Sequence, residues 1–229
     1  MSHGSFHPVV MFHHPPPPLD LSSEDSRPPP PCSALSRLRG RCAYPAGGYD
    51  EPRFLYTQPL FAAAAVPSGG AGVEQRGPQY VYGGRRDVHV GVDVMCPAGK
   101  PVYAPAAGTV WSAGYNGDAG DYGGVVITRH ALEGPRGVVV FYVLFGHLSR
   151  RDALRWAEGD ALEAGTFLAR VGKRSENGGW EPHLHLQVQL TEPQGRDMPG
   201  VVARDDRERA MLEFPDPAMI MKLEKTVMA

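Results

Sequence analysis

The strongest constraint on the fold is an alternation within residues 181–190, which read EPHLHLQVQL. Successive side chains of a β-strand point to opposite faces, so two histidines and two glutamines would share one face here. These are His183, His185, Gln187 and Gln189. Leucine and valine occupy the other face, which indicates a strand packed on a hydrophobic core. A solvent-facing strand with incidental histidines is the simpler interpretation when this stretch is taken alone.

A second segment, RRDVHVGVDVMCPAGKPVYAP at 85–105, divides in the same way. If it is extended, His89, Gly91 and Asp93 share one face and four valines share the other. Gly91 has no side chain, so it leaves space above the strand between its two polar neighbours. Imidazole nitrogen and carboxylate oxygen both suit Zn²⁺, and two histidines with one carboxylate leave a fourth position open for water. Together the two segments indicate a catalytic type of metal site.

A third segment, GVVVFYVLFGHLSR, is apolar from Val138 to Phe145 and is followed by His147. Its apolar run predicts a buried strand. An imidazole at the end of such a strand is placed to transfer a proton or to stabilise developing charge. A hydrogen-bonded structural histidine is the alternative interpretation.

The motifs HVGVD, FGHLS and PHLHLQV, in that order and around PAGKPVYAPAAGTV, resemble the LytM or lysostaphin-type zinc metallopeptidases, peptidase family M23. The resemblance covers about residues 83–190. It implies one Zn²⁺ per chain and hydrolysis of an amide bond by a metal-activated water, with two histidines handling protons and oxyanion charge. The implied zinc ligands are His89, Asp93 and His185, and the implied catalytic histidines are His147 and His183.

Two details depart from the members of this family that cut cell walls. Phe145 stands where those enzymes commonly have tyrosine, and GKRSENGGWEP replaces a turn of small residues before the last strand. These details resemble a branch of the family found in intracellular proteins, fused between kinase-like and class III aminotransferase domains. Trp180 is expected to cover an apolar or planar group, and Glu181 to recognise an amine. The residues expected to line the substrate pocket are Phe145, Asn177, Trp180 and Glu181.

Short segments rich in strand-forming residues, divided by glycine and proline, predict a mainly β fold with antiparallel strands. The predicted strands are 88–94, 101–104, 108–113, 124–130, 138–146, 166–171 and 183–190. The resemblance implies a two-sheet LytM/lysostaphin-like domain, a duplicated hybrid motif, with the metal in a groove between loops. Short peripheral helices are expected at 150–156 and 204–214.

The chain is expected to have four parts. Residues 1–48 contain PPPP twice and four of the nine histidines, which indicates a disordered Pro/His-rich arm. Residues 49–80 are expected to be an extended arm and linker, and 81–192 the zinc catalytic domain. Residues 193–229 are expected to form a C-terminal extension that packs on the core.

Composition excludes some partners and favours a location. The formal net charge of the 229 residues is -2, so no basic surplus indicates nucleic acid or an anionic membrane as partner. The N-terminus lacks the basic, apolar and small-residue pattern of a signal peptide, so a cytoplasmic location is expected. Three cysteines do not indicate a disulfide framework. Cys96 is expected to be a small buried residue rather than a zinc ligand.

The main functional expectation is a zinc-dependent metallohydrolase acting on a small soluble peptide-like or biosynthetic substrate. The resemblance also implies a functional association with an aminotransferase. The alternatives are a peptidoglycan endopeptidase, a zinc-dependent cyclase or amide-forming enzyme, and a non-catalytic LytM-like regulatory module. The sequence leaves the substrate and the oligomeric state open.

Overall fold

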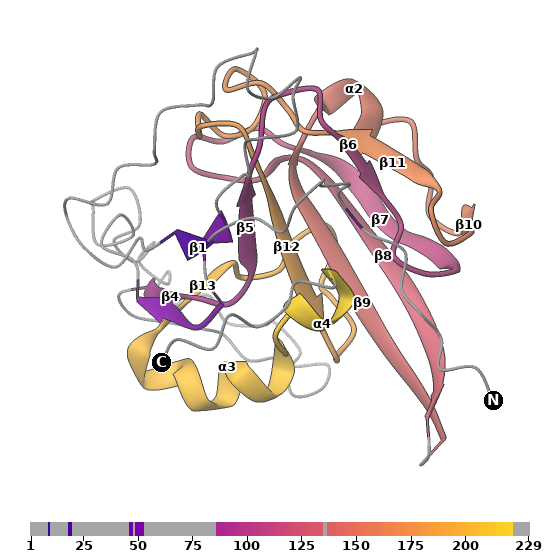
Figure 1. Cartoon of the computed structure of the whole chain (residues 1–229), viewed down its shortest axis with the longest axis vertical. Helices are drawn as coiled ribbons and strands as arrows, with labels where there is room; N and C mark the ends of the chain where they lie inside the picture. The colour runs from indigo at the N-terminus through magenta and orange to yellow at the C-terminus, as the bar shows by residue number, and fades with distance from the viewer. Residues whose placement is uncertain are drawn as a thin grey trace, which may run out of the picture.

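The computed structural model describes residues 86–134 and 137–221, with short pieces of the N-terminal part at 9, 18–19, 46–47 and 49–52. Most of the predicted disordered arm, most of the predicted linker and the last eight positions lie outside the described residues. Figure 1 shows a strongly twisted sheet, with helices at its margins and a long hairpin that projects beyond the other strands.

The described residues fold mainly as β-strands, with a few short helices. The strands are β1 (Pro18–Leu19), β2 (Ala46–Gly47), β3 (Glu51–Pro52), β4 (Arg86–His89), β5 (Val92–Met95), β6 (Pro101–Tyr103), β7 (Gly108–Asn116), β8 (Gly123–Gly134), β9 (Gly137–Leu148), β10 (Ala161–Leu162), β11 (Phe167–Arg170), β12 (His183–Gln189) and β13 (Val201–Ala203). The helices are α2 (Arg150–Ala153), the 3-10 helix η3 (Arg204–Asp206), α3 (Arg207–Glu213) and α4 (Ala218–Met221). The predicted mainly β, antiparallel class is confirmed.

The strands form three sheets in the described part of the chain, where two were expected. The largest has eight strands in the order β1-β2-β5-β12-β9-β8-β7-β10, antiparallel except for the β1–β2 pair. β11 pairs with β6, and β4 lies between β13 and β3. The strands β1, β2, β3, β10 and β13 and the helix α4 were not predicted. The predicted helix at 150–156 is only the short α2, whereas the one at 204–214 is present as η3 and α3.

The predicted single strand at 88–94 is wrong in one respect, because β4 and β5 belong to different sheets. β4 pairs with β13 and β3, whereas β5 pairs with β12 and β2. The chain changes sheet at Gly91, where a Cβ would lie 2.5 Å from Cε1 of His185 and 2.8 Å from the carbonyl oxygen of Leu186. Only glycine lets the chain cross so close to that imidazole.

The apolar face of β12 packs on the main core, as the alternation predicts. Leu184 and Leu186 are fully buried there against Val94 and Phe145. A second cluster, around Ile127, Leu144 and Met198, packs separately. The histidine face of β12 is therefore not open to solvent, since all seven residues of β12 are buried.

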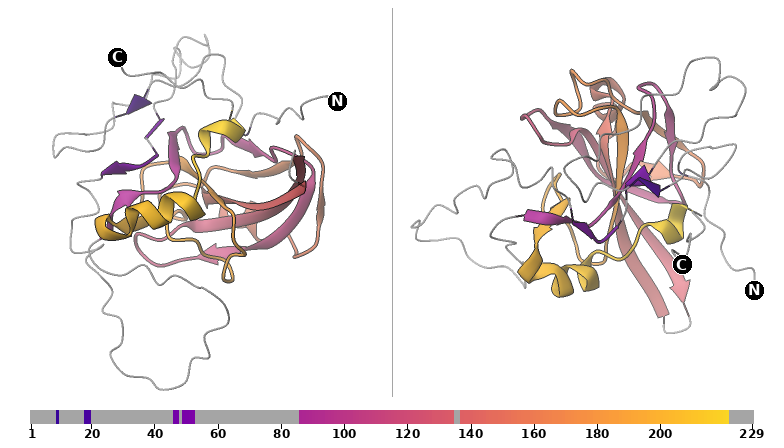
Figure 2. Two further views of the ribbon diagram at one scale, coloured as in Figure 1. Left: turned by 90° about the horizontal axis from the view of Figure 1, so that it is seen from below. Right: turned by 60° about the vertical axis from the view of Figure 1, so that its left-hand side comes forward.

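The described part of the predicted C-terminal extension packs on the rest of the fold. Phe214 and Ala210 of the α3 region are buried against Val88 and Val202, so α3 covers the β4–β13 pair. Figure 2 shows this helix beside β4 and away from the projecting β8–β9 hairpin. The extension thereby fixes β4, the strand that ends at His89.

Candidate metal and catalytic centre

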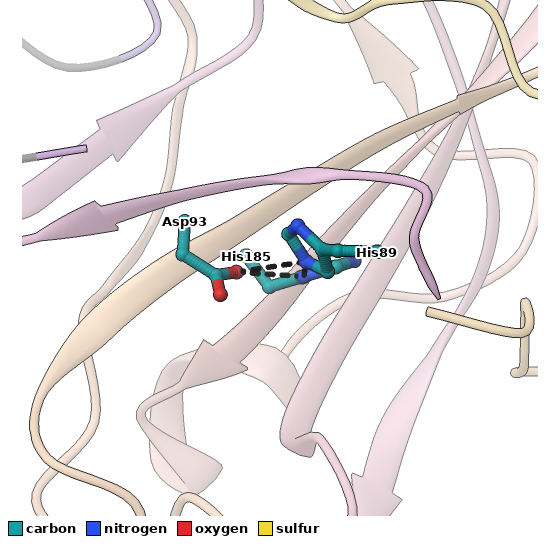
Figure 3. Close-up of side chains that lie close together, drawn as sticks. All are labelled: His89, Asp93 and His185. Atoms are coloured by element: carbon teal, nitrogen blue, oxygen red, sulfur yellow. Dashed lines mark hydrogen bonds and ion pairs between the residues drawn. The ribbon is translucent and has the colours of Figure 1, made fainter. Parts of the chain in front are cut away.

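Three side chains of metal-ligand type meet where two sheets come together (Figure 3). Asp93 of β5 lies directly opposite His185 of β12 in the strand register, and His89 reaches them from the end of β4. His185 Nδ1 lies 2.8 Å from Asp93 Oδ1. His89 Nε2 lies 3.2 Å from His185 Nδ1 and 3.4 Å from Asp93 Oδ1. All three side chains are buried.

The donor set fits Zn²⁺. Nitrogen and oxygen ligands lie about 2.0–2.2 Å from zinc, so two ligands at a tetrahedral angle are about 3.4 Å apart. The two separations from His89 Nε2, 3.2 and 3.4 Å, agree with that spacing, and the 2.8 Å pair between Asp93 and His185 is shorter. Two imidazole nitrogens and a carboxylate oxygen converge on one point, and three such ligands leave a fourth position open.

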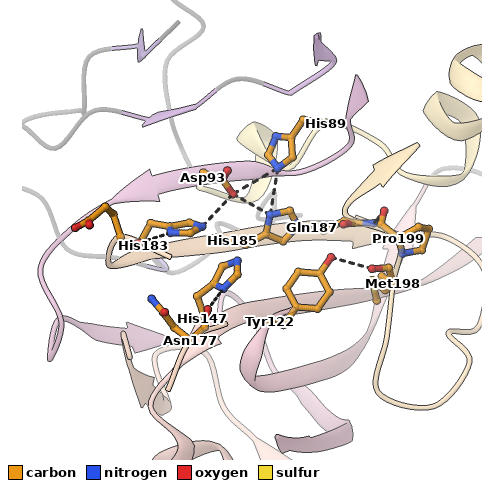
Figure 4. Close-up of polar contacts among 11 residues, drawn as sticks. His89, Asp93, Tyr122, His147, Asn177, His183, His185, Gln187, Met198 and Pro199 are labelled. Atoms are coloured by element: carbon orange, nitrogen blue, oxygen red, sulfur yellow. Dashed lines mark hydrogen bonds and ion pairs between the residues drawn. The ribbon is translucent and has the colours of Figure 1, made fainter. Parts of the chain in front are cut away.

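The ring of His185 is oriented from its far side by Gln187 (Figure 4). His185 Nε2 lies 3.1 Å from Gln187 Oε1, and the Gln187 amide nitrogen donates to the carbonyl oxygen of Pro199 at 3.3 Å. Since the amide nitrogen is the donor to Pro199, its oxygen is the acceptor for an Nε2–H. The lone pair of His185 is then on Nδ1, which faces the other two ligands. The alternation predicted Gln187 on the same strand face as His183 and His185, but no role was predicted for it.

The two expected catalytic histidines are in contact. The ring centroids of His147 and His183 are 4.2 Å apart. His147 Nδ1 lies 3.0 Å from the carbonyl oxygen of Asn177, and His183 Nδ1 lies 2.6 Å from that of Glu181. Each carbonyl accepts a hydrogen bond from an Nδ1–H, so proton exchange falls to the two Nε2 atoms. His183 Nε2 lies 3.9 Å from Asp93 Oδ1, which places this pair beside the candidate ligands.

His147 is held neutral and in a strained conformation. Burial lowers its pKa well below the usual 6.5, and the neighbouring imidazoles of His183 and His185 lower the pKa further against an opposing effect of Asp93. Its φ is 60°, a left-handed value that is unusual for a residue other than glycine. Backbone hydrogen bonds from His147 N to Tyr122 O and from Gly172 N to His147 O, both 2.8 Å, hold this conformation.

The structure corrects the expected role of Phe145. Its side chain is fully buried in the main core, opposite Leu186 on the apolar side of the β9–β12 pair, so it cannot line a substrate pocket. In a regular strand His147 would share the face of Phe145, because two residues separate equivalent faces. The positive φ of His147 breaks this alternation, which residue types alone did not reveal.

The other three expected pocket residues lie beside the histidine pair. Trp180 contacts both rings edge-on, with centroids 6.1 Å from His147 and 6.4 Å from His183. Asn177 is fully buried and donates from its side chain to the carbonyl oxygen of Trp180 at 3.0 Å. Glu181 is exposed and paired with Arg174 at 2.6 Å, so its charge is already compensated.

Tyr122, which directly precedes β8, was not predicted as a residue of the centre. Its ring centroid lies 5.6 Å from that of His147 and 5.2 Å from that of His185, and its hydroxyl donates to the carbonyl oxygen of Met198 at 2.8 Å. A phenol therefore lies in the centre although position 145 is phenylalanine. The only signal was a tyrosine within the glycine-rich GDYGG, which reads as a turn.

Cys96 is buried in the main core, as expected, and burial raises the pKa of its thiol to about 12. Within the described residues, no helix has the length and apolar character needed to cross a membrane.

Residues 87–197 match the family model described as Peptidase family M23. This range is slightly less than half of the chain. It includes the three candidate ligands and the two expected catalytic histidines. A curated relative, an uncharacterized metalloprotease of Haemophilus influenzae, is 33% identical over 107 residues, which are 47% of this chain. The chain spans only 20% of the length of that relative.

Three solved structures are similar over part of the chain. A mutant catalytic domain of the prophage-encoded M23 protein EnpA from Enterococcus faecalis is 24% identical, covers 59% of this chain and 87% of that chain, and has a TM-score of 0.38. A zinc containing peptidase from Vibrio cholerae is 27% identical, with coverages of 46% and 28% and a TM-score of 0.35. The catalytic domain of lysostaphin from Staphylococcus simulans is 23% identical, with coverages of 49% and 77% and a TM-score of 0.36.

Proposed function

We propose that residues 87–197, which match the M23 peptidase family, act as a zinc-dependent metallopeptidase that hydrolyses an amide or peptide bond. The observation that supports this most is the convergence of three buried donor atoms of zinc-ligand type beside two histidines oriented by backbone carbonyls. The residues that would hold one Zn²⁺ are His89, Asp93 and His185. When bound there, the ion would supply an activated water and polarise the substrate carbonyl.

His147 and His183 would handle the protons. Their rings are in contact, and the pKa of His147 is lowered first by burial and then by the neighbouring imidazole of His183. His147 is therefore neutral near neutral pH, and its ring is available as a base. The neutral ring takes a proton at Nε2, and the protonated ring stabilises the oxyanion or returns a proton to the leaving amine.

Two aromatic residues complete the walls of the centre. Tyr122 packs against His147 and His185. Trp180, which lies just before β12, packs against His147 and His183. They restrict water around the reacting groups, which strengthens the electrostatic interactions there. Because Trp180 lies against both catalytic rings, we propose a small peptide-like or biosynthetic amide as substrate. The association with an aminotransferase and the cytoplasmic location stay predictions.

The proposal is tested by separating metal binding from catalysis in the full chain. Wild-type protein should bind one more zinc per chain than His185→Ala. The comparison between the two proteins removes the contribution of zinc bound elsewhere on the chain. His147→Ala and His183→Ala should keep that zinc and lose about 10² or more in the rate of peptide hydrolysis, the usual effect of removing a general acid or base. His130→Gln is a matched control, because His130 is also fully buried but lies outside the centre.

The substrates to compare are purified peptidoglycan and a panel of dipeptides and small amides. Equal zinc content in wild type and His185→Ala would refute the metal site. Full activity in both catalytic-histidine variants would place the chemistry elsewhere. Rapid cleavage of peptidoglycan with no action on the small substrates would show a cell-wall endopeptidase instead.

A further inference from the structure

A hollow of about 650 Å³ lies beside the candidate centre, and its walls are rich in arginine. The volume is within the range of about 300–1,000 Å³ that is typical of small-molecule sites. None of its residues takes part in the chemistry proposed above. The lining residues are Ser149, Arg151, Asp152, Arg155, Phe167 and Arg170.

The hollow carries an excess of positive charge. Its one carboxylate, Asp152, is buried and bonded to Arg170, whose Nη1 lies 3.2 and 3.0 Å from the two carboxylate oxygens. That pair is neutral as a unit. Arg151 and Arg155 form no ion pair with any residue that the structure describes. Two guanidinium charges of the lining are therefore uncompensated.

One of these two guanidinium groups is fixed in place. Arg155 lies over the ring of Trp156 at 4.8 Å and over that of Phe167 at 4.7 Å, and it donates to the carbonyl oxygen of Phe167 at 2.5 Å. All these partners are neutral, so they hold the side chain without cancelling its charge. A guanidinium held in this way loses little conformational entropy when it binds an anion, and its planar fork suits carboxylate or phosphate oxygens.

The hollow adjoins the end of β9 that carries His147, because Ser149 lines it. Ser149 is two residues after His147, a separation of about 7 Å in extended chain. The end of β11 and the residues after it run beside them, since Ser149 N donates to Arg170 O at 2.7 Å and Gly172 N donates to His147 O at 2.8 Å. A small substrate whose amide lies at His147 can therefore extend a second group towards the arginines.

We propose that this hollow binds a negatively charged group, a carboxylate or a phosphate, of the substrate cleaved at the neighbouring centre. This inference rests on the proposed peptidase function. It also revises the expectation that Glu181 selects an amine-bearing substrate, because Glu181 is paired with Arg174 whereas Arg151 and Arg155 are uncompensated. The substrate class is an acidic or phosphorylated peptide-like amide.

The test begins with binding and does not depend on catalysis. Glutarate and inorganic phosphate are titrated separately into full-length His89→Ala protein, and binding is followed by calorimetry and by the arginine Nε–H resonances. Saturable binding should weaken at least about tenfold in the additional Arg151→Gln variant and as salt is raised. Arg204→Gln, in η3 beside β13, should bind like the parent. The tighter of the two probes identifies the anion.

A second measurement connects the hollow to the substrate. With zinc-loaded wild type, Arg151→Gln should raise KM for amide substrates that carry the preferred anion and leave neutral analogues unchanged. Anion affinity equal in Arg151→Gln and its parent, or reduced as much by Arg204→Gln, would overturn the inference. Anion binding lost in Arg151→Gln, together with no hydrolysis of any amide by zinc-loaded wild type, would uphold the hollow and refute the peptidase function.

Discussion

Removing the side-chain amide of Gln187 should weaken zinc binding without touching a ligand. In Gln187→Ala the Nε2–H of His185, 3% exposed, loses its acceptor at 3.1 Å. A buried donor left without a partner costs about 1–3 kcal/mol. The ring escapes that cost only by moving its proton to Nδ1, which removes the lone pair that faces Asp93 and His89. The zinc-free protein can make this shift, whereas the zinc-bound ring cannot, so the cost falls on the bound state and lowers zinc affinity.

The size of the effect follows from two independent estimates. A cost of about 1–3 kcal/mol corresponds to roughly 5- to 150-fold in an equilibrium constant, since about 1.4 kcal/mol is tenfold. Loss of a partner that orients a metal ligand typically costs 10- to 100-fold in metal affinity. We therefore expect a loss of about 10- to 100-fold in Gln187→Ala, and a much smaller change in Gln187→Glu, which keeps an acceptor oxygen.

Competition with a chromophoric chelator measures the zinc affinity of each variant, and ¹⁵N spectra of the imidazoles report which nitrogen of His185 carries the proton. Gln189→Ala is the matched control, because Gln189 is on the same strand face but donates to Thr191 and Glu213, away from the ligands. The reasoning is refuted if Gln187→Ala binds zinc within twofold of wild type. It is also refuted if Gln189→Ala loses as much affinity.

Three further changes have expected outcomes. Gly91→Ala should reduce zinc affinity by at least about tenfold in the same competition assay, because its Cβ would meet the ring of His185 at 2.5 Å. Tyr122→Phe should lower the free energy of unfolding by about 0.5–1.5 kcal/mol in urea titration, since it loses the hydrogen bond to Met198 O, and should keep bound zinc. Burial lowers the pKa of His130 below its ordinary 6.5, so its neutral form stabilises the fold above about pH 6.5 and this contribution is lost as pH falls towards the lower folded value. The Tm of His130→Gln should therefore fall less than that of wild type between pH 7.5 and 5.

The alternation of polar and apolar residues predicted much of the fold and of the candidate site. It identified β12 and its buried apolar face, and it brought together the histidines that meet Asp93 in the structure. It failed where the backbone departs from a regular strand. Gly91 was expected only to leave space, yet it moves the chain from one sheet to another. The positive φ of His147 likewise turns it away from the face of Phe145, and residue types do not encode that reversal directly.

Contacts between residues far apart in the chain could not be predicted from the sequence either. The partner of Gln187 is a backbone carbonyl in the C-terminal segment, and the hydroxyl of Tyr122 bonds to that same segment at Met198. Every residue has a backbone carbonyl, so no residue type indicates which carbonyl will accept these hydrogen bonds. The sequence likewise contains no local pattern that predicts the pairing of β13 with β4. The ligand types were predictable, whereas the residues that orient them were not.

The placement of His89 and Asp93 on separate sheets gives a bound ion a mechanical role. An ion held by His89, Asp93 and His185 would cross-link the three-stranded sheet to the eight-stranded one. The free energy of metal binding would then add to the stability of the junction between them. Chelation should consequently loosen β4, β13 and α3 before the rest of the molecule. Hydrogen exchange in β4, β13 and α3 would therefore report metal occupancy before any change in the central strands.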